Sequence, residues 1–114
     1  MEKPMYPAAS REIAQMREEL APEILNTFRA FSHQVFADGA LPSKTKELIA
    51  VAVAHVTQCA YCIRGHTKRA RLKGATGQEI MEAIWVAAEM RAGGAISHSA
   101  IAIDTINEEE AKAE

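Results

Sequence analysis

Cys59 and Cys62 are the only two cysteines of the 114-residue chain, and they form a Cys-x-x-Cys pair. His66 follows Cys62 by four residues, and Glu47 precedes Cys59 by twelve. The reactive form of a cysteine is its thiolate, so a cysteine pair is most useful where nearby groups accept or relay protons. These residue types at this spacing therefore indicate thiol chemistry assisted by a histidine and a carboxylate.

A helix that starts at or just before Cys59 and runs to Lys73, with Gly74 as its stop, would position the pair. Both cysteines then lie in the first turn, where unsatisfied N–H groups and the positive end of the helix dipole stabilise a thiolate. Residues three or four apart share one helix face. The two sulfurs can therefore form a disulfide, and His66 can take the proton of Cys62.

Glu47 lies near the middle of the preceding helix, which we expect over residues 42–58. A carboxylate among apolar side chains is costly unless it is paired, and His66 is a candidate partner across the helix–helix interface. A surface ion pair with Lys44 or Lys46 is the alternative. This helix is apolar nearly all round, so we expect it to be central and buried. Its apolar residues are Leu48, Ile49, Val51, Ala52, Val53 and Val56.

Two helices are expected before this hairpin. Ser10 can cap the first, which runs to about Leu20. Pro22 opens the second, whose apolar residues recur at three- and four-residue spacings, and Gly39 ends it. The β-branched run near Val51 is the one place where a strand remains possible.

Two more helices are expected after the hairpin. Thr76 and Glu79 have the spacing of a capping box that opens a helix through Met90. Gly93-Gly94 predicts a helix break, and a sixth helix should run from Ala95 to about Ile106. The acidic tail at residues 108–110 is expected to be a frayed, solvated end.

Length and composition predict one all-α domain over residues 1–114. Aromatic residues make up only 5% of the chain and alanine is abundant, which favours close helix-on-helix packing. The net charge of −2 excludes a strong electrostatic footprint for nucleic acid. No stretch has the length of a membrane span or the apolar core of a signal peptide, so we expect no membrane association and a cytoplasmic location.

Other readings of the cysteine pair remain open. Zinc could be held by Cys59, Cys62, His66 and Glu47, although structural zinc sites usually draw on a second cysteine or histidine pair. A purely structural disulfide would stabilise little, because so short a loop restricts the unfolded chain little. Haem attachment is excluded because Ile63 stands where a histidine is needed.

The sequence gives less reason to place the other three histidines in the site. His55 is two turns from Glu47, and a core position with a satisfied ring is favoured over a secondary role in the site. His33 and His98 have no partner in the sequence pattern and are expected to be structural or exposed. Tyr61, between the cysteines, is expected to shield the site rather than meet substrate.

The arrangement Glu47-x11-Cys59-x2-Cys62-x3-His66 resembles the AhpD-like alkylhydroperoxidases of the carboxymuconolactone decarboxylase family. The flanking block from Lys44 and the text Cys-Ala-Tyr-Cys-Ile-Arg-Gly-His-Thr are also similar to that family. The resemblance covers about residues 42–106 and, more loosely, the N-terminal helices. It implies an AhpD-like bundle of about six helices, with the Cys-x-x-Cys pair at the start of the fourth.

By this resemblance the protein would be a thiol-dependent peroxidase without a bound cofactor or metal. Cys62 would attack a hydroperoxide and Cys59 would resolve the resulting sulfenic acid to a disulfide. Glu47 and His66 would form the proton relay. Thioredoxin-like or lipoamide-linked proteins would be the reductants. Tyr61 departs from members that have histidine at this position, which removes any relay through it.

The family also contains decarboxylases that act on a γ-lactone, so a decarboxylase or a non-redox protein that binds a small acid is the alternative. Decarboxylation has no use for a redox dithiol, which favours redox chemistry here. The resemblance further implies a homo-oligomer, a trimer or hexamer. The apolar residues that would pack between subunits, with the protomer's own core as the alternative, are Trp85, Val86, Ile96, Ala100, Ile101 and Ile103.

Overall fold

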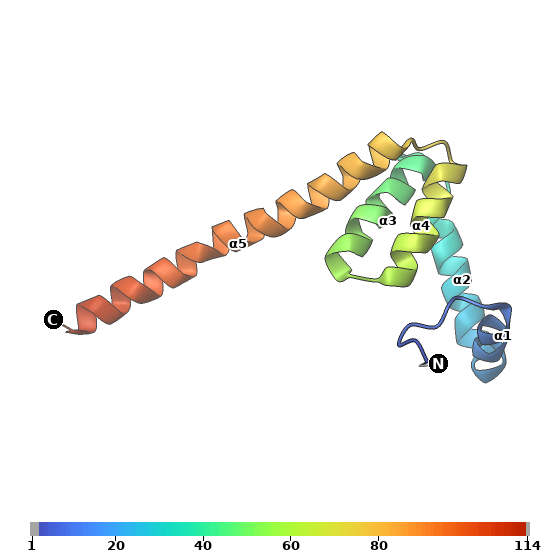
Figure 1. Ribbon diagram of the computed structural model, residues 1–114, viewed down its shortest axis with the longest axis horizontal. Helices are drawn as coiled ribbons and strands as arrows, with labels where there is room; N and C mark the ends of the chain where they lie inside the picture. The colour runs from blue at the N-terminus through green and yellow to red at the C-terminus, as the bar shows by residue number, and fades with distance from the viewer. Residues whose placement is uncertain (1–2, 114) are drawn as a thin grey trace. The chain divides into compact units, whose positions relative to one another are not determined.

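The protein is described by a computed structural model, which covers residues 3–113 (Figure 1). Over these residues it forms five helices and no strand. They are α1 (Arg11–Leu20), α2 (Pro22–Phe36), α3 (Ser43–Thr57), α4 (Ala60–Leu72) and α5 (Gly77–Ala113). The all-α prediction is confirmed, but the chain has five helices where six were expected. None of the helices within residues 3–113 has both the length and the apolar character needed to cross a membrane.

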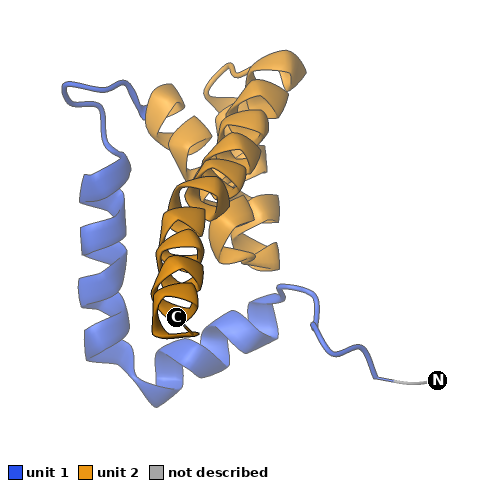
Figure 2. Cartoon of the chain, turned by 90° about the vertical axis from the view of Figure 1, so that its left-hand side faces the viewer, with its two compact units in different colours: residues 1–43 blue, residues 44–114 orange. Residues whose placement is uncertain are grey.

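The chain divides into two compact units, residues 1–43 and residues 44–114 (Figure 2). In the first unit, the side chain of Ser10 accepts the Ile13 N–H at 3.2 Å, which confirms the predicted cap of α1. Pro22 occupies the first turn of α2, where its missing N–H costs nothing. No residue of α1 or α2 is buried, so these two helices form no core between them.

The second unit has a small core made mainly of short side chains. Four residues are buried, and Leu48 and Ile84 pack against them. They are Val51 of α3, Ala70 of α4, Ala75 of the connection between α4 and α5, and Ile80 of α5. Small residues at these positions let the backbones of the helices approach closely. Fully burying one aliphatic side chain such as Val51 contributes about 1.5 kcal/mol.

The prediction that residues 42–58 form a helix buried on all sides is wrong in part. The helix is present, so the possible strand near Val51 is excluded, and one face is buried. The opposite face is open: Ile49, Val53 and Val56 are 47%, 51% and 44% exposed. With few neighbouring helices in the unit, α3 can be covered on one side only.

The expected break at Gly93-Gly94 is also wrong, because α5 runs unbroken from Gly77 to Ala113. A glycine costs a helix only about 1 kcal/mol relative to alanine, and unlike proline it keeps its N–H donor. Strong helix formers on both sides therefore carry the helix through. For the same reason the acidic tail at residues 108–110, expected to fray, is helical.

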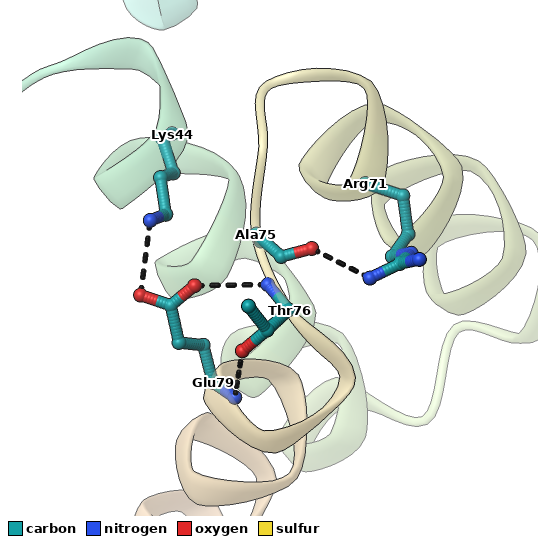
Figure 3. A network of polar contacts seen from close by, with 5 residues as sticks. All are labelled: Lys44, Arg71, Ala75, Thr76 and Glu79. Carbon is teal, nitrogen blue, oxygen red and sulfur yellow. Dashed lines mark hydrogen bonds and ion pairs between the residues drawn. The ribbon is translucent and has the colours of Figure 1, made fainter.

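Gly74 ends α4 as predicted, with a φ of +93° in the left-handed region that favours glycine. The capping box that opens α5 is also present: Thr76 N–H donates to Glu79 at 2.8 Å, and Glu79 N–H donates to the Thr76 hydroxyl at 3.1 Å (Figure 3). These two bonds satisfy N–H groups that the first turn of a helix leaves unpaired.

The capping box is tied to the start of α3 and to the end of α4. Lys44 Nζ lies 3.0 Å from a Glu79 carboxylate oxygen, and an Arg71 guanidinium N–H donates to the Ala75 carbonyl at 2.9 Å (Figure 3). The Thr76 N–H, and next Lys44, hold the pKa of Glu79 below its ordinary value of 4.5. Three helices of this unit thus meet at one polar network.

Candidate functional site

Cys59 and Cys62 are joined by a disulfide, with their Cα atoms 5.2 Å apart. Cys59 is the N-cap of α4, and its sulfur accepts the backbone N–H of Cys62 at 3.2 Å. The predicted placement of the pair at the start of the fourth helix is confirmed. The sulfurs lie where the helix presents unpaired N–H groups and the positive end of its dipole.

The connection between α3 and α4 is only two residues long. Gln58 takes a φ of +58°, in the left-handed region that non-glycine residues seldom occupy. The N–H of Cys59 then donates to the Ala54 carbonyl of α3 at 3.1 Å. This tight turn sets the position of Cys59 against the end of α3, and so places the cysteine pair at one end of the hairpin.

Glu47 and His66 meet across this hairpin. The Nδ1 atom of His66 lies 2.7 Å from Oε2 of Glu47, and the two side chains are only 18% and 3% exposed. The predicted pairing is present. Burial of Glu47 does not fit the alternative of an ion pair at the surface, and Lys44 contacts Glu79 instead. A carboxylate accepts hydrogen bonds, so Nδ1 carries the proton and Nε2 is the nitrogen able to act as a base.

The remaining histidines behave differently. His55 is half-buried and its Nδ1–H donates to the Val51 carbonyl of its own helix at 2.7 Å, in agreement with the satisfied-ring reading. His33 and His98 are exposed on α2 and α5. Tyr61 is 47% exposed on the first turn of α4, beside the cysteine pair in sequence.

The zinc alternative requires at least three metal-binding side chains that converge. Within residues 3–113, no three histidine, cysteine, aspartate or glutamate side chains are grouped so that they could hold a metal ion. The two cysteines are bonded to each other.

Two features of the site were missed by sequence reasoning. The Arg91 guanidinium donates to the Val56 carbonyl at 3.1 Å, which satisfies a backbone group in the last turn of α3. Thirty-five residues separate the two, so no local pattern marks them. The use of the Cys59 sulfur as a helix cap was also missed, although its place one residue before the helix is the position where a side-chain acceptor is expected.

Comparisons with known proteins point to one family. The sequence model of the carboxymuconolactone decarboxylase family matches residues 22–105, which include all four predicted site residues. A protein of the cox locus of Paracoccus denitrificans is 63% identical over 83 residues, covering 73% of this chain and 75% of its own.

Solved structures resemble this chain as well. A carboxymuconolactone decarboxylase family protein from Legionella pneumophila matches with a TM-score of 0.64 and 38% identity, over 69% of this chain and 70% of its own. Another from Thermotoga maritima, described as a candidate for involvement in antioxidative response, matches with a TM-score of 0.50 and 42% identity. That match covers 55% of this chain and 67% of its own.

Proposed function

The chain belongs to the carboxymuconolactone decarboxylase family, and we propose that within it this protein is a thiol-dependent peroxidase that cycles Cys59 and Cys62. The observation that carries the proposal is the largely buried Glu47–His66 pair, whose histidine lies one helical turn after Cys62 of the Cys-x-x-Cys disulfide. A disulfide alone would fit a structural cross-link, and a Glu–His pair alone would fit a structural contact. Together they supply a redox couple and a proton carrier.

The chemistry starts from the reduced pair. Glu47 holds His66 with Nε2 as the basic nitrogen, and His66 lies one helical turn after Cys62 on the same face. His66 takes the thiol proton, and the Cys62 thiolate attacks one oxygen of a hydroperoxide. The O–O bond breaks, Cys62 becomes a sulfenic acid, and the departing alkoxide takes the proton to leave as an alcohol.

Cys59 then attacks the sulfur of the sulfenic acid. The S–S bond forms and hydroxide leaves as water, which yields the disulfide state described above. A dithiol reductant must reopen it by thiol–disulfide exchange. Thioredoxin-like or lipoamide-linked proteins in the cytoplasm are the proposed source of these electrons. The antioxidative description of the Thermotoga maritima relative supports a role of this kind.

The test is peroxide consumption with dithiothreitol as reductant. We expect Cys62→Ser to lower the rate to the level without protein, because the attacking sulfur is gone. His98→Ala is the matched control, since this exposed histidine hydrogen-bonds the Gly94 carbonyl of its own helix α5, and it should keep the wild-type rate. Equal rates for wild type and Cys62→Ser would end the proposal.

The competing function is decarboxylation of a lactone acid, or binding of a small acid without redox chemistry, for which the family description is the supporting observation. Mass spectrometry of the reduced protein before and after peroxide separates the two. Loss of two hydrogens with a Cys59–Cys62 linkage supports the peroxidase. Unchanged thiols together with carbon dioxide release from a carboxylated lactone would support the decarboxylase.

The assembly is part of the same proposal. Trp85, Val86, Ile96, Ile101 and Ile103 are 57–74% exposed, so they do not fill the protomer's own core. Apolar side chains that gather on one element without cover mark association surfaces. A closed homo-oligomer, a trimer or a hexamer, would bury them.

A further inference from the structure

The two sulfurs of the disulfide have different surroundings. Cys59 stands one residue before α4, and its carbonyl already accepts the Ile63 N–H at 2.9 Å as the first bond of the helix. The sulfur of the same residue accepts another backbone hydrogen bond, from the Cys62 N–H at 3.2 Å. The sulfur thus takes the place of the serine, threonine or aspartate oxygen that usually caps a helix.

This backbone bond favours one redox state of Cys59. Sulfur in a disulfide is a weak acceptor, whereas a thiolate is a charged acceptor and binds an N–H more strongly. The positive end of the α4 dipole adds to the same preference. Opening the disulfide with the charge left on Cys59 therefore strengthens contacts that the folded chain already makes.

Cys62 lies inside the first turn, and its own N–H is the donor to Cys59. What Cys62 has instead is His66 one turn further along the helix, with Glu47 fixing the tautomer. A histidine with a basic Nε2 exchanges protons with a sulfur. One cysteine is thus placed to hold a negative charge and the other to gain and lose a proton.

We propose that Cys59 is the resident thiolate of the reduced pair, so that it is the leaving group when a reductant opens the disulfide and the nucleophile when the disulfide closes. This inference rests on the proposed thiol–disulfide cycle. It predicts that a reducing thiol forms its mixed disulfide with Cys62 and not with Cys59.

The exchange balances as follows. A thiolate of a dithiol reductant attacks the Cys62 sulfur, the S–S bond breaks, and its electron pair goes to Cys59, which leaves as thiolate. The second thiolate of the reductant attacks the reductant's own sulfur in the mixed disulfide. The reductant departs as a disulfide, and Cys62 takes a proton through His66. In the closing direction, the Cys59 thiolate attacks the sulfur of the Cys62 sulfenic acid, the S–O bond breaks, and the departing hydroxide takes a proton from the solvent to form water.

The direct test maps the mixed disulfide of the wild-type chain. Oxidised protein is mixed with glutathione, quenched early with acid and N-ethylmaleimide, and the peptide that holds both cysteines is sequenced by mass spectrometry. We expect glutathione on Cys62 and maleimide on Cys59 in at least about tenfold excess over the reverse. Glutathione mainly on Cys59, an equal mixture, or no adduct would overturn the inference.

A second test removes only the backbone donor. Cys62→Ser and Cys62→Pro both lack the second thiol, but proline also lacks the N–H that bonds the Cys59 sulfur, and proline is tolerated in the first turn of a helix. At about pH 6.5, where an ordinary thiol is almost wholly protonated, iodoacetamide should label Cys59 about tenfold faster in the serine variant. Circular dichroism checks that α4 persists. Equal labelling in two folded variants contradicts the inference.

These tests do not depend on peroxide turnover. Glutathione on Cys62 in a protein that consumes no peroxide would support the assignment of the sulfurs and reject the peroxidase. Glutathione on Cys59 in an active peroxidase would do the reverse.

Discussion

In the α3–α4 hairpin, the side chains that carry the chemistry are buried or half-buried, whereas every residue of the distal segment of α5, residues 94–113, is exposed. Both regions are helical and both contain many apolar residues. The hairpin covers Glu47 to 3% exposure, while Ile96 in the distal segment is 74% exposed. Two stretches of similar local character thus have opposite environments within one unit.

The contrast shows what each region needs. The hairpin has its partners: a carboxylate for its histidine, a helix cap for its first N–H groups, and the Arg91 guanidinium at its turn. In the distal segment, the side-chain contacts of His98, Ser99, Thr105 and Lys112 are all to groups of α5 itself. Helices gain most of their stability from packing of an apolar face, and the apolar side chains of this segment are exposed. We therefore expect changes in the hairpin to alter chemistry, and changes in the distal segment to alter assembly.

The largest effect should come from removing one charge in the hairpin. Glu47→Gln keeps the size of the side chain and an oxygen that can accept the His66 proton, but the protonated imidazole loses its neighbouring negative charge. Steady-state peroxide consumption should fall by about 10²-fold, as for loss of general acid–base assistance. Asp104→Asn, which removes a carboxylate from the distal segment, is the control and should keep the wild-type rate. A full rate in Glu47→Gln would show that the pair is structural.

The next effect concerns assembly. Placing aspartate at both Ile96 and Ile103 puts charge on a face that we propose to be covered by another subunit, which is costly unless the charge is paired. Light scattering after size exclusion should show the wild type as a trimer or hexamer and the double variant as smaller species. A wild-type mass near 12.4 kDa would contradict the oligomer. Glutamine at the exposed Glu108 serves as the control for a change of charge alone.

A smaller effect tests the continuity of α5. A Cβ added at Gly94 would meet nothing within 4 Å, so Gly94→Ala should fit the helix. The expected gain in the free energy of unfolding is about 1 kcal/mol, measured by urea denaturation at fixed protein concentration. Gly74→Ala is the opposite control, because its φ of +93° strains any side chain, and it should destabilise. A loss of stability in Gly94→Ala would mean that the helix turns at this position.

The smallest effect is a pH dependence at the start of α5. The pKa of Glu79 is lowered by the Thr76 N–H and then by Lys44, so its contribution to stability is present above its ordinary value of 4.5 and is lost as the pH falls through the lower folded value. Glu79→Gln should therefore be less stable than wild type at neutral pH, and the difference should shrink in acid. Thermal unfolding between neutral pH and pH 3 measures it. If the difference in stability between wild type and Glu79→Gln stayed constant across that pH range, the lowered pKa of Glu79 would be contradicted.

The helix boundaries and much of the site were predictable because they depend on residues close together in the sequence. Caps at Ser10 and Thr76, the stop at Gly74 and the placement of Cys59 and Cys62 depend on groups within one turn of each other, so their spacing in the sequence carries the information. The Glu47–His66 contact was also predictable. A carboxylate on a mostly apolar helix needs a partner, and His66 lies on the neighbouring helix of the hairpin.

The tertiary structure decided what depends on how many neighbours an element has. Gly93-Gly94 has the composition of a break, yet the helix continues because the cost of two glycines is spread over a long cooperative segment. The face of α3 that holds Val53 is exposed in the described part of the second unit, and the hydrophobic pattern of the sequence does not show which apolar face will be covered. The bond from Arg91 to Val56 likewise depends on how two helices far apart in the sequence meet in space. The spacing of residues predicts helix caps and groups that lie within one helical turn. Burial, and contacts between distant residues, depend on how separate segments pack, which the spacing does not encode.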